Sequence, residues 1–170
     1  MSRPPGYQFA TEQELGTDPG QRLQQDRVRI ENIRTASGAR LLLGVIADGD
    51  GGDGAGNAAE RVIHQLFETV QKSHKGDILS LLIDGLTQAN ATMMEGFRVA
   101  ATVVAIKNGR AFLAHAGHTS AYLIRDGNVT LLTRRNRELL GDSHPPQIST
   151  NTSKANCFKL ATTLYCAVMV

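Results

Sequence analysis

Three aspartates and five glycines crowd one stretch of this sequence, residues 45–70. Asp48, Asp50 and Asp53 follow an apolar run and precede a pattern typical of an amphipathic helix. Carboxylates bind hard divalent cations such as Mg²⁺ and Mn²⁺, and glycines let backbone carbonyls approach an ion. The stretch therefore predicts a hard-cation site at the end of a buried strand. Taken alone, it is equally compatible with a polar turn between a strand and a helix.

Other chemistries for this glycine-rich loop lack a required residue or charge. A P-loop needs Lys-Ser or Lys-Thr after the glycines, where this chain has Asn57-Ala58. Three aspartates would repel the pyrophosphate of a dinucleotide. An EF-hand loop counted from Asp48 would place Gly52 and Ala59 at positions that need oxygen ligands. The hard-cation site remains as the chemical interpretation.

The segments on either side of the loop predict the elements that would position it. Residues 26–33 alternate between apolar and polar, whereas residues 40–47 are almost wholly apolar. Together they predict a hairpin whose second strand lies inside a sheet. A helix follows, and Asn57 with Glu60 suggests a capping box at its start.

A second helix is expected from Asp77 to about Glu95, after which the apolar period changes. Asn108-Gly109 and Asp126-Gly127 are strong hairpin turns and predict four antiparallel strands in a meander over about residues 100–133. His115 alternates with alanines in this segment and is expected on the sheet surface. The order of strands, helices and further strands indicates an α+β fold with antiparallel sheet.

Composition restricts the class of protein. The chain has 170 residues, 41% of them hydrophobic, and a formal net charge of +2. That charge gives no reason to expect nucleic acid or a membrane surface as a partner, and no apolar run reaches the roughly 20 residues of a membrane span. Residues 1–20 are predicted to be a polar N-terminal leader and residues 21–170 one domain. With no apolar signal segment, we expect a cytoplasmic protein.

Several motifs in succession resemble the PPM family of metal-dependent serine/threonine protein phosphatases, the type-2C class. Asp48-Gly49-Asp50-Gly51-Gly52 is similar to the family's Asp-Gly-x-x-Gly at the end of a buried strand. Residues 88–90 match its Ala-Asn pair, and residues 101–133 look like its run of strands ending in Leu-Thr. Upstream, residues 22–27 stand where the family has Arg-x-x-x-Glu-Asp. The similarity covers roughly residues 18–135.

The resemblance implies a mechanism and a set of site residues. Two divalent cations, Mn²⁺ or Mg²⁺, would activate a water that attacks phosphoserine or phosphothreonine in line. Asp48 would bridge the metals, and the carbonyl of Gly49 would bind one of them. Asp26 would replace the family's glutamate as a further ligand. Arg22 would hold the phosphate oxygens.

The chain also departs from the family pattern. His118 stands where the family has a metal-supporting aspartate, and it is a possible additional ligand, as are Asp50 and Asp53. Residues 163–170 resemble a later family strand. Aligned on Cys166, the metal-binding aspartate of that strand becomes Val168.

The expected fold is a four-layer α/β/β/α sandwich of two antiparallel sheets flanked by helices, incomplete because the usual C-terminal part is lacking. Two dications about 4 Å apart repel each other by roughly 17 kcal/mol at an effective dielectric of about 20. Asp26 and Asp48 supply only two negative charges against this repulsion. One tightly held metal ion is therefore expected rather than two, with weak or absent activity.

Three hypotheses about function follow. The first is an enzyme that hydrolyses phosphoserine or phosphothreonine in proteins with the help of Mn²⁺ or Mg²⁺. The second is a non-catalytic phosphatase-like module that binds a phosphorylated protein or a cognate protein kinase. The third is a truncated fragment of a full phosphatase.

Overall fold

The computed structural model describes residues 9–12, 24–134, 136–154, 157–161 and 166–169. In chain order the elements are β1 (Phe9–Glu12), β2 (Asp26–Arg34), β3 (Arg40–Asp50), α1 (Ala55–Lys72), α2 (Ile78–Ala91), β4 (Arg98–Lys107), β5 (Arg110–Ala116), β6 (Ser120–Arg125), β7 (Asn128–Leu131), β8 (Ser149–Lys154), β9 (Cys157–Ala161) and β10 (Cys166–Met169).

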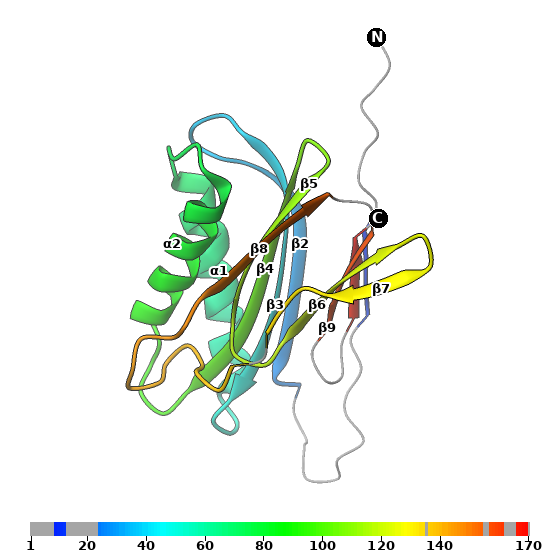
Figure 1. Ribbon diagram of the computed structural model, residues 1–170. Helices are drawn as coiled ribbons and strands as arrows, with labels where there is room; N and C mark the ends of the chain where they lie inside the picture. Colours follow the sequence, from blue (N-terminus) through cyan, green and yellow to red (C-terminus); the bar gives the residue numbers. More distant parts are fainter. Residues whose placement is uncertain (1–8, 13–23, 135, 155–156, 162–165, 170) are drawn as a thin grey trace.

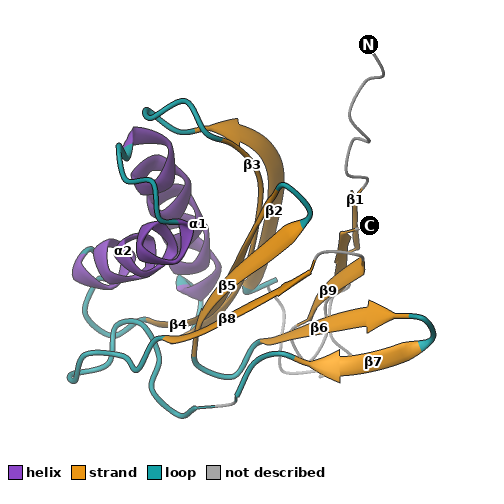
Figure 2. Ribbon diagram, turned by 45° about the horizontal axis from the view of Figure 1, so that its top comes forward, coloured by secondary structure: helices purple, strands orange, loops and turns teal. Residues whose placement is uncertain are grey.

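The strands form two antiparallel sheets (Figure 1). The first sheet has the order β2-β3-β4-β5-β8, and the second has the order β1-β10-β9-β6-β7. Helices α1 and α2 cover one face of the first sheet, and the second sheet lies on its other side (Figure 2). The predicted α+β class with two antiparallel sheets is confirmed. Within the described ranges no helix covers the outer face of the second sheet, so three of the four expected layers are present.

The middle of strand β3, residues 41–47, is apolar because both of its faces are covered. Leu43 and Val45 point toward the helices and pack in one core with Leu66 of α1. Leu42 and Ile46 point the other way, into a second core between the two sheets. Successive strand residues face opposite sides, so a strand between two cores requires a continuous apolar run.

The predicted hairpins are present, but the predicted four-strand meander is wrong. Asn108 and Asp126 adopt positive φ angles of 51° and 50° in the β4–β5 and β6–β7 turns, as two-residue hairpin turns require. Strands β5 and β6, however, belong to different sheets. The chain crosses between the sheets at Gly117, whose φ is 93°. A Cβ there would lie 2.7 Å from the Cβ of Ala100, so only glycine fits.

The capping-box prediction is also wrong. Helix α1 begins at Ala55 with Gly54 as its N-cap, and no side chain caps it. A Cβ on Gly54 would lie 2.5 Å from the ring of Phe97, so tertiary packing selects this start. Helix α2 has the side-chain cap: Asp77 accepts a hydrogen bond of 2.9 Å from the backbone N–H of Ser80.

Residues 1–20, predicted to be a polar leader, contain strand β1, which pairs with β10. The sequence pattern missed this strand because its only partner is more than 150 residues away. Strand β10 in turn lies between β1 and β9. Neither of the helices in the described part of the chain is long and apolar enough to cross a membrane.

Candidate metal site

Asp26 and Asp48 lie directly opposite each other on neighbouring strands. In the β2–β3 hairpin, Arg34 and Arg40 pair next to the turn, and the same register pairs Asp26 with Asp48 at the other end. Residues opposite each other in antiparallel strands have Cβ atoms about 4.5–5.5 Å apart. Asp26 is buried at 6% exposure, and the side chain of Asp48 is 24% exposed. Two of the predicted ligands are therefore brought together at one half-buried point.

The chain before β2 and the glycine loop pack closely and fix Asp48 in place. The backbone N–H of Gly49 donates to the carbonyl of Gln25 over 3.4 Å, and the Gln25 amide donates to the carbonyl of Gly52 over 3.2 Å. A Cβ on Gly49 would lie 2.2 Å from the carbonyl oxygen of Ala55. Glycine is required here by close backbone approach, which contact between the loop and the start of α1 imposes.

His118 joins the two aspartates from the crossing between the sheets. Its Nδ1 lies 3.6 Å from Oδ2 of Asp48. The crossing is held by a 2.7 Å hydrogen bond between the hydroxyls of Thr102 and Thr119. Of the additional ligands that the sequence suggested, His118 is the one that contacts Asp48.

His115 is buried, so the prediction that it lies on the sheet surface is wrong. Its side chain points between the sheets, where Nδ1 is 2.9 Å from the hydroxyl of Thr102 and Nε2 is 3.2 Å from the carbonyl of Arg134. Loss of hydration on burial lowers the pKa of His115 below its ordinary value. The alternation with alanines correctly indicated a strand, but it does not show whether the face that carries His115 is covered by another part of the chain.

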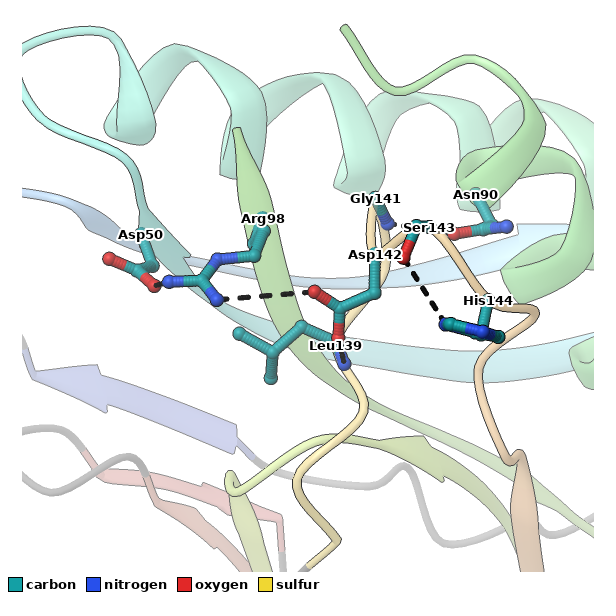
Figure 3. Close-up of polar contacts among 8 residues, drawn as sticks. All are labelled: Asp50, Asn90, Arg98, Leu139, Gly141, Asp142, Ser143 and His144. Atoms are coloured by element: carbon teal, nitrogen blue, oxygen red, sulfur yellow. Dashed lines mark hydrogen bonds and ion pairs between the residues drawn. The ribbon is translucent and has the colours of Figure 1, made fainter. Parts of the chain in front are cut away.

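Asp50 is engaged in an ion pair with Arg98. The two residues are opposite each other on β3 and β4, and the Arg98 guanidinium forms an ion pair with the Asp50 carboxylate (Figure 3). On the other side, Nη1 of Arg98 lies 4.0 Å from Oδ1 of Asp142. Arg98 therefore sits between two carboxylates, and Asp50 is committed to an ion pair.

The turn that carries Asp142 is itself fixed to the domain. The carboxylate of Asp142 accepts a 2.7 Å hydrogen bond from the N–H of Leu139, and the N–H of Gly141 donates to the side chain of Asn90 over 2.8 Å (Figure 3). Leu140 and Val99 exchange two backbone hydrogen bonds of 2.9 Å. Sequence reasoning missed the role of Arg98, although counting the β3–β4 register would have placed it opposite Asp50.

Two predicted site residues remain, Asp53 and Arg22. Asp53 is exposed in the loop before α1. Arg22, predicted to hold the phosphate, lies outside the described residues.

The Asp26–Asp48 pair fits one divalent cation. Like charges directly opposite each other destabilise a sheet, and a bound dication between two carboxylates would remove that repulsion. The imidazole of His118 adds a third possible donor at the edge of the pair. Among the described residues, however, no group of three or more His, Cys, Asp or Glu side chains is arranged to hold a metal ion. Within the part of the chain that the structure describes, the geometry supports a single, incompletely coordinated ion and offers no second set of ligands.

The sequence matches no family model, but it is related to a known phosphatase. It is 32% identical over 108 residues to the serine/threonine protein phosphatase PstP of Mycobacterium tuberculosis. The match covers 58% of this chain and 21% of that relative. The chain therefore spans about a fifth of the length of the relative it matches.

Solved structures resemble the chain over almost its full length. The serine/threonine phosphatase of S. agalactiae superposes with a TM-score of 0.76 at 17% identity, covering 91% of this chain and 78% of that one. The catalytic domain of PstP in complex with two manganese ions superposes with a TM-score of 0.66 at 24% identity, covering 91% and 76%. Stp1 from Staphylococcus aureus gives 0.74 at 14% identity, covering 92% and 75%. The predicted resemblance is thus confirmed, and the chain has the fold of the PPM-type serine/threonine phosphatases.

Proposed function

We propose that this chain is a metal-dependent serine/threonine protein phosphatase domain with one strong cation site and low activity. The observation that carries the proposal is the cross-strand pair of Asp26 and Asp48, half-buried at the strand ends of a PPM-type fold. PstP, whose catalytic domain is described in complex with two manganese ions, supports Mn²⁺ as the ion. Mg²⁺ is the alternative, since carboxylate oxygens suit both.

Each residue has a separate task in this proposal. Asp26 and Asp48 would hold the ion, together with the carbonyl of Gly49. When bound, the ion would lower the pKa of a coordinated water so that it can attack phosphorus. His118, 3.6 Å from Asp48, is placed to orient the Asp48 carboxylate or to exchange a proton with water. Arg22 would hold the phosphate oxygens; it is assigned from the family resemblance alone.

Hydrolysis of a phosphothreonine peptide in the presence of increasing Mn²⁺ tests the proposal. Asp48→Asn and Asp26→Asn should each reduce the rate at least tenfold and weaken Mn²⁺ binding measured by calorimetry. Asp53→Asn is the matched control because Asp53 is exposed in the same loop; it should leave both quantities unchanged. Equal effects of all three substitutions, or Mn²⁺ binding that survives Asp48→Asn, would contradict the proposed site.

A non-catalytic role is the second candidate. The Asp50 carboxylate is engaged in an ion pair with Arg98. The described residues also offer no group of three metal-ligating side chains. The fold would then bind a phosphorylated protein or a cognate protein kinase without turnover. Calorimetry separates the two functions, since phosphopeptide binding without Mn²⁺-dependent hydrolysis would identify the binding module.

The phosphorylated protein is the proposed partner in both cases, with neither nucleic acid nor a membrane involved. A cytoplasmic location is proposed as well. Fractionation of cells that produce the chain tests the location.

A further inference from the structure

Asn136, in the middle of the basic run at residues 134–138, is fixed beside the candidate site; Arg135 of this run lies outside the described residues. The backbone N–H of Asn136 donates to the carbonyl of Gly117 over 3.0 Å, and the N–H of Gly117 donates to the Asn136 side chain over 2.7 Å. Gly117 immediately precedes His118, which contacts Asp48. The run is therefore tied to the crossing that forms one side of the Asp26–Asp48 pair.

Further hydrogen bonds hold both ends of the run. The carbonyl of Arg134 lies 3.2 Å from Nε2 of the buried His115. The Asn136 amide donates to the carbonyl of Gln147 over 2.8 Å, and the N–H of Gln147 donates to the carboxylate of Glu138 over 2.8 Å. Glu138, the acidic residue of the run, is thus engaged by the backbone, and it forms no ion pair with an arginine among the described residues.

The guanidinium groups of Arg134 and Arg137 are exposed, and neither forms an ion pair with any described residue. Some described arginines pair with carboxylates, as Arg29 does with Glu31 and Arg98 with Asp50, whereas others such as Arg34 and Arg40 form no ion pair within the described residues and serve as controls away from the site. An unpaired guanidinium on a fixed backbone is suited to bidentate binding of a carboxylate or phosphate. We call Arg134 and Arg137 the arginine rim.

We propose that the arginine rim selects phosphopeptides that carry a second anionic group close to the phosphorylated residue. The second group would be an acidic side chain or another phosphate, because both present the same oxygens to a guanidinium. An extended peptide spans about 3.3–3.6 Å per residue, so a residue a few positions from one bound at Asp48 reaches the rim. The proposal rests on the proposed function for the place of the phosphorylated residue.

Charges around the Asp26–Asp48 pair favour one direction of peptide binding. Asp53 is exposed in the glycine loop after β3 and would repel an acidic flank, whereas Asp50 is paired with Arg98. The arginine rim lies on the side of the crossing at Gly117. An anionic flank is therefore attracted to one side of the site only.

Fluorescence anisotropy with three peptides tests this inference. Each peptide carries a phosphonate that cannot be hydrolysed in place of phosphoserine, and its flanks hold neutral residues, glutamates or a second phosphoserine. With Mn²⁺ present, the two anionic peptides should bind about tenfold tighter than the neutral one. The difference should shrink as ionic strength rises, since exposed charges are screened.

A pair of double variants provides the control. Arg134→Gln/Arg137→Gln should abolish the preference while leaving binding of the neutral peptide within twofold. Arg34→Gln/Arg40→Gln removes the same charge from two exposed arginines that face each other at the other end of the β2–β3 hairpin, and it should preserve the preference. Thermal unfolding of each variant checks that the fold is retained.

Three results with the peptides would overturn the proposed role of the arginine rim. The first is a preference for anionic peptides that persists in Arg134→Gln/Arg137→Gln, and the second is an equal loss of this preference in Arg34→Gln/Arg40→Gln. The third is a loss of affinity for the neutral peptide in Arg134→Gln/Arg137→Gln that matches the loss for the anionic peptides. Duplex DNA that binds through the same arginines, without any preference among peptides, would also overturn it. Because the assay measures binding alone, absence of hydrolysis with an intact preference would reject the proposed catalysis and leave the rim standing.

Discussion

The two sheets of this chain differ in how completely their faces are covered. Strands β3 and β4 of the first sheet are buried on both faces, between the helices and the second sheet. Strand β7 of the second sheet is exposed along its whole length, with Val129 at 64% and Leu131 at 52% exposure. Asp26 and Asp48 belong to the covered sheet. Asp48 is therefore positioned by β3, which is packed on both faces, whereas Asp26 is on β2 at the edge of the same sheet.

The largest expected effect is a difference in stability between the two sheets. Leu43→Ala leaves a cavity under the helices and should lower the free energy of unfolding by about 2–5 kcal/mol. Leu131→Ala on exposed β7 should change it by less than about 0.5 kcal/mol. Urea denaturation measures both. Similar losses for the two variants would remove the distinction between a rigid and a peripheral sheet.

The glycine loop gives the next effect in size. Gly49→Ala places a Cβ against the carbonyl of Ala55 and should cost about 1–3 kcal/mol of stability, with a loss of Mn²⁺ affinity because Asp48 is its neighbour. Gly76→Ala is the control, since a Cβ there meets open space and φ is not positive. Unfolding and calorimetry on both variants report the two quantities. A neutral Gly49→Ala would show that the close approach to α1 does not hold the loop.

The buried histidine between the sheets predicts a dependence on pH. The folded chain holds the pKa of His115 below its ordinary value through burial, whereas the unfolded chain protonates near pH 6.5. The unfolded state therefore binds more protons below about pH 6.5, and the free energy of unfolding should fall as the pH drops through that range. His115→Gln should flatten this slope between pH 8 and 5.5, and His64→Gln on the exposed face of α1 should not. An identical slope in all three proteins would contradict the assignment.

The smallest effect is expected at Arg98, the first residue of β4 in the covered sheet. Arg98→Gln removes a half-exposed ion pair and should cost about 0.2–1 kcal/mol, less at high salt. It also releases Asp50, so the apparent affinity for Mn²⁺ should rise. Lys75→Gln breaks the Lys75–Asp84 pair and serves as control for stability alone. Calorimetry that finds no gain in affinity for Arg98→Gln would show that Asp50 does not reach the ion.

Local sequence patterns predicted elements whose signals lie close together in the chain. The two hairpin turns depend on Asn108 and Asp126 tolerating positive φ, which side-chain chemistry alone indicates. The apolar run at residues 40–47 predicted a strand inside a sheet, and most of β3 is buried on both faces. Asp48 and Gly49 were identified from the same short stretch, and the pairing of Asp48 with Asp26 follows from counting along the hairpin.

The sequence by itself therefore determined the α+β class, the hairpins and the acidic strand end, because each depends on neighbouring residues. Only the tertiary structure decided that β5 and β6 lie in different sheets, that His115 is buried, and that Arg98 forms an ion pair with Asp50. It also decided that α1 begins at Ala55 with Gly54 as its N-cap, rather than after an Asn57 cap. Each of these features is set by contact between segments distant in the chain, and local propensity contains no information about such contacts.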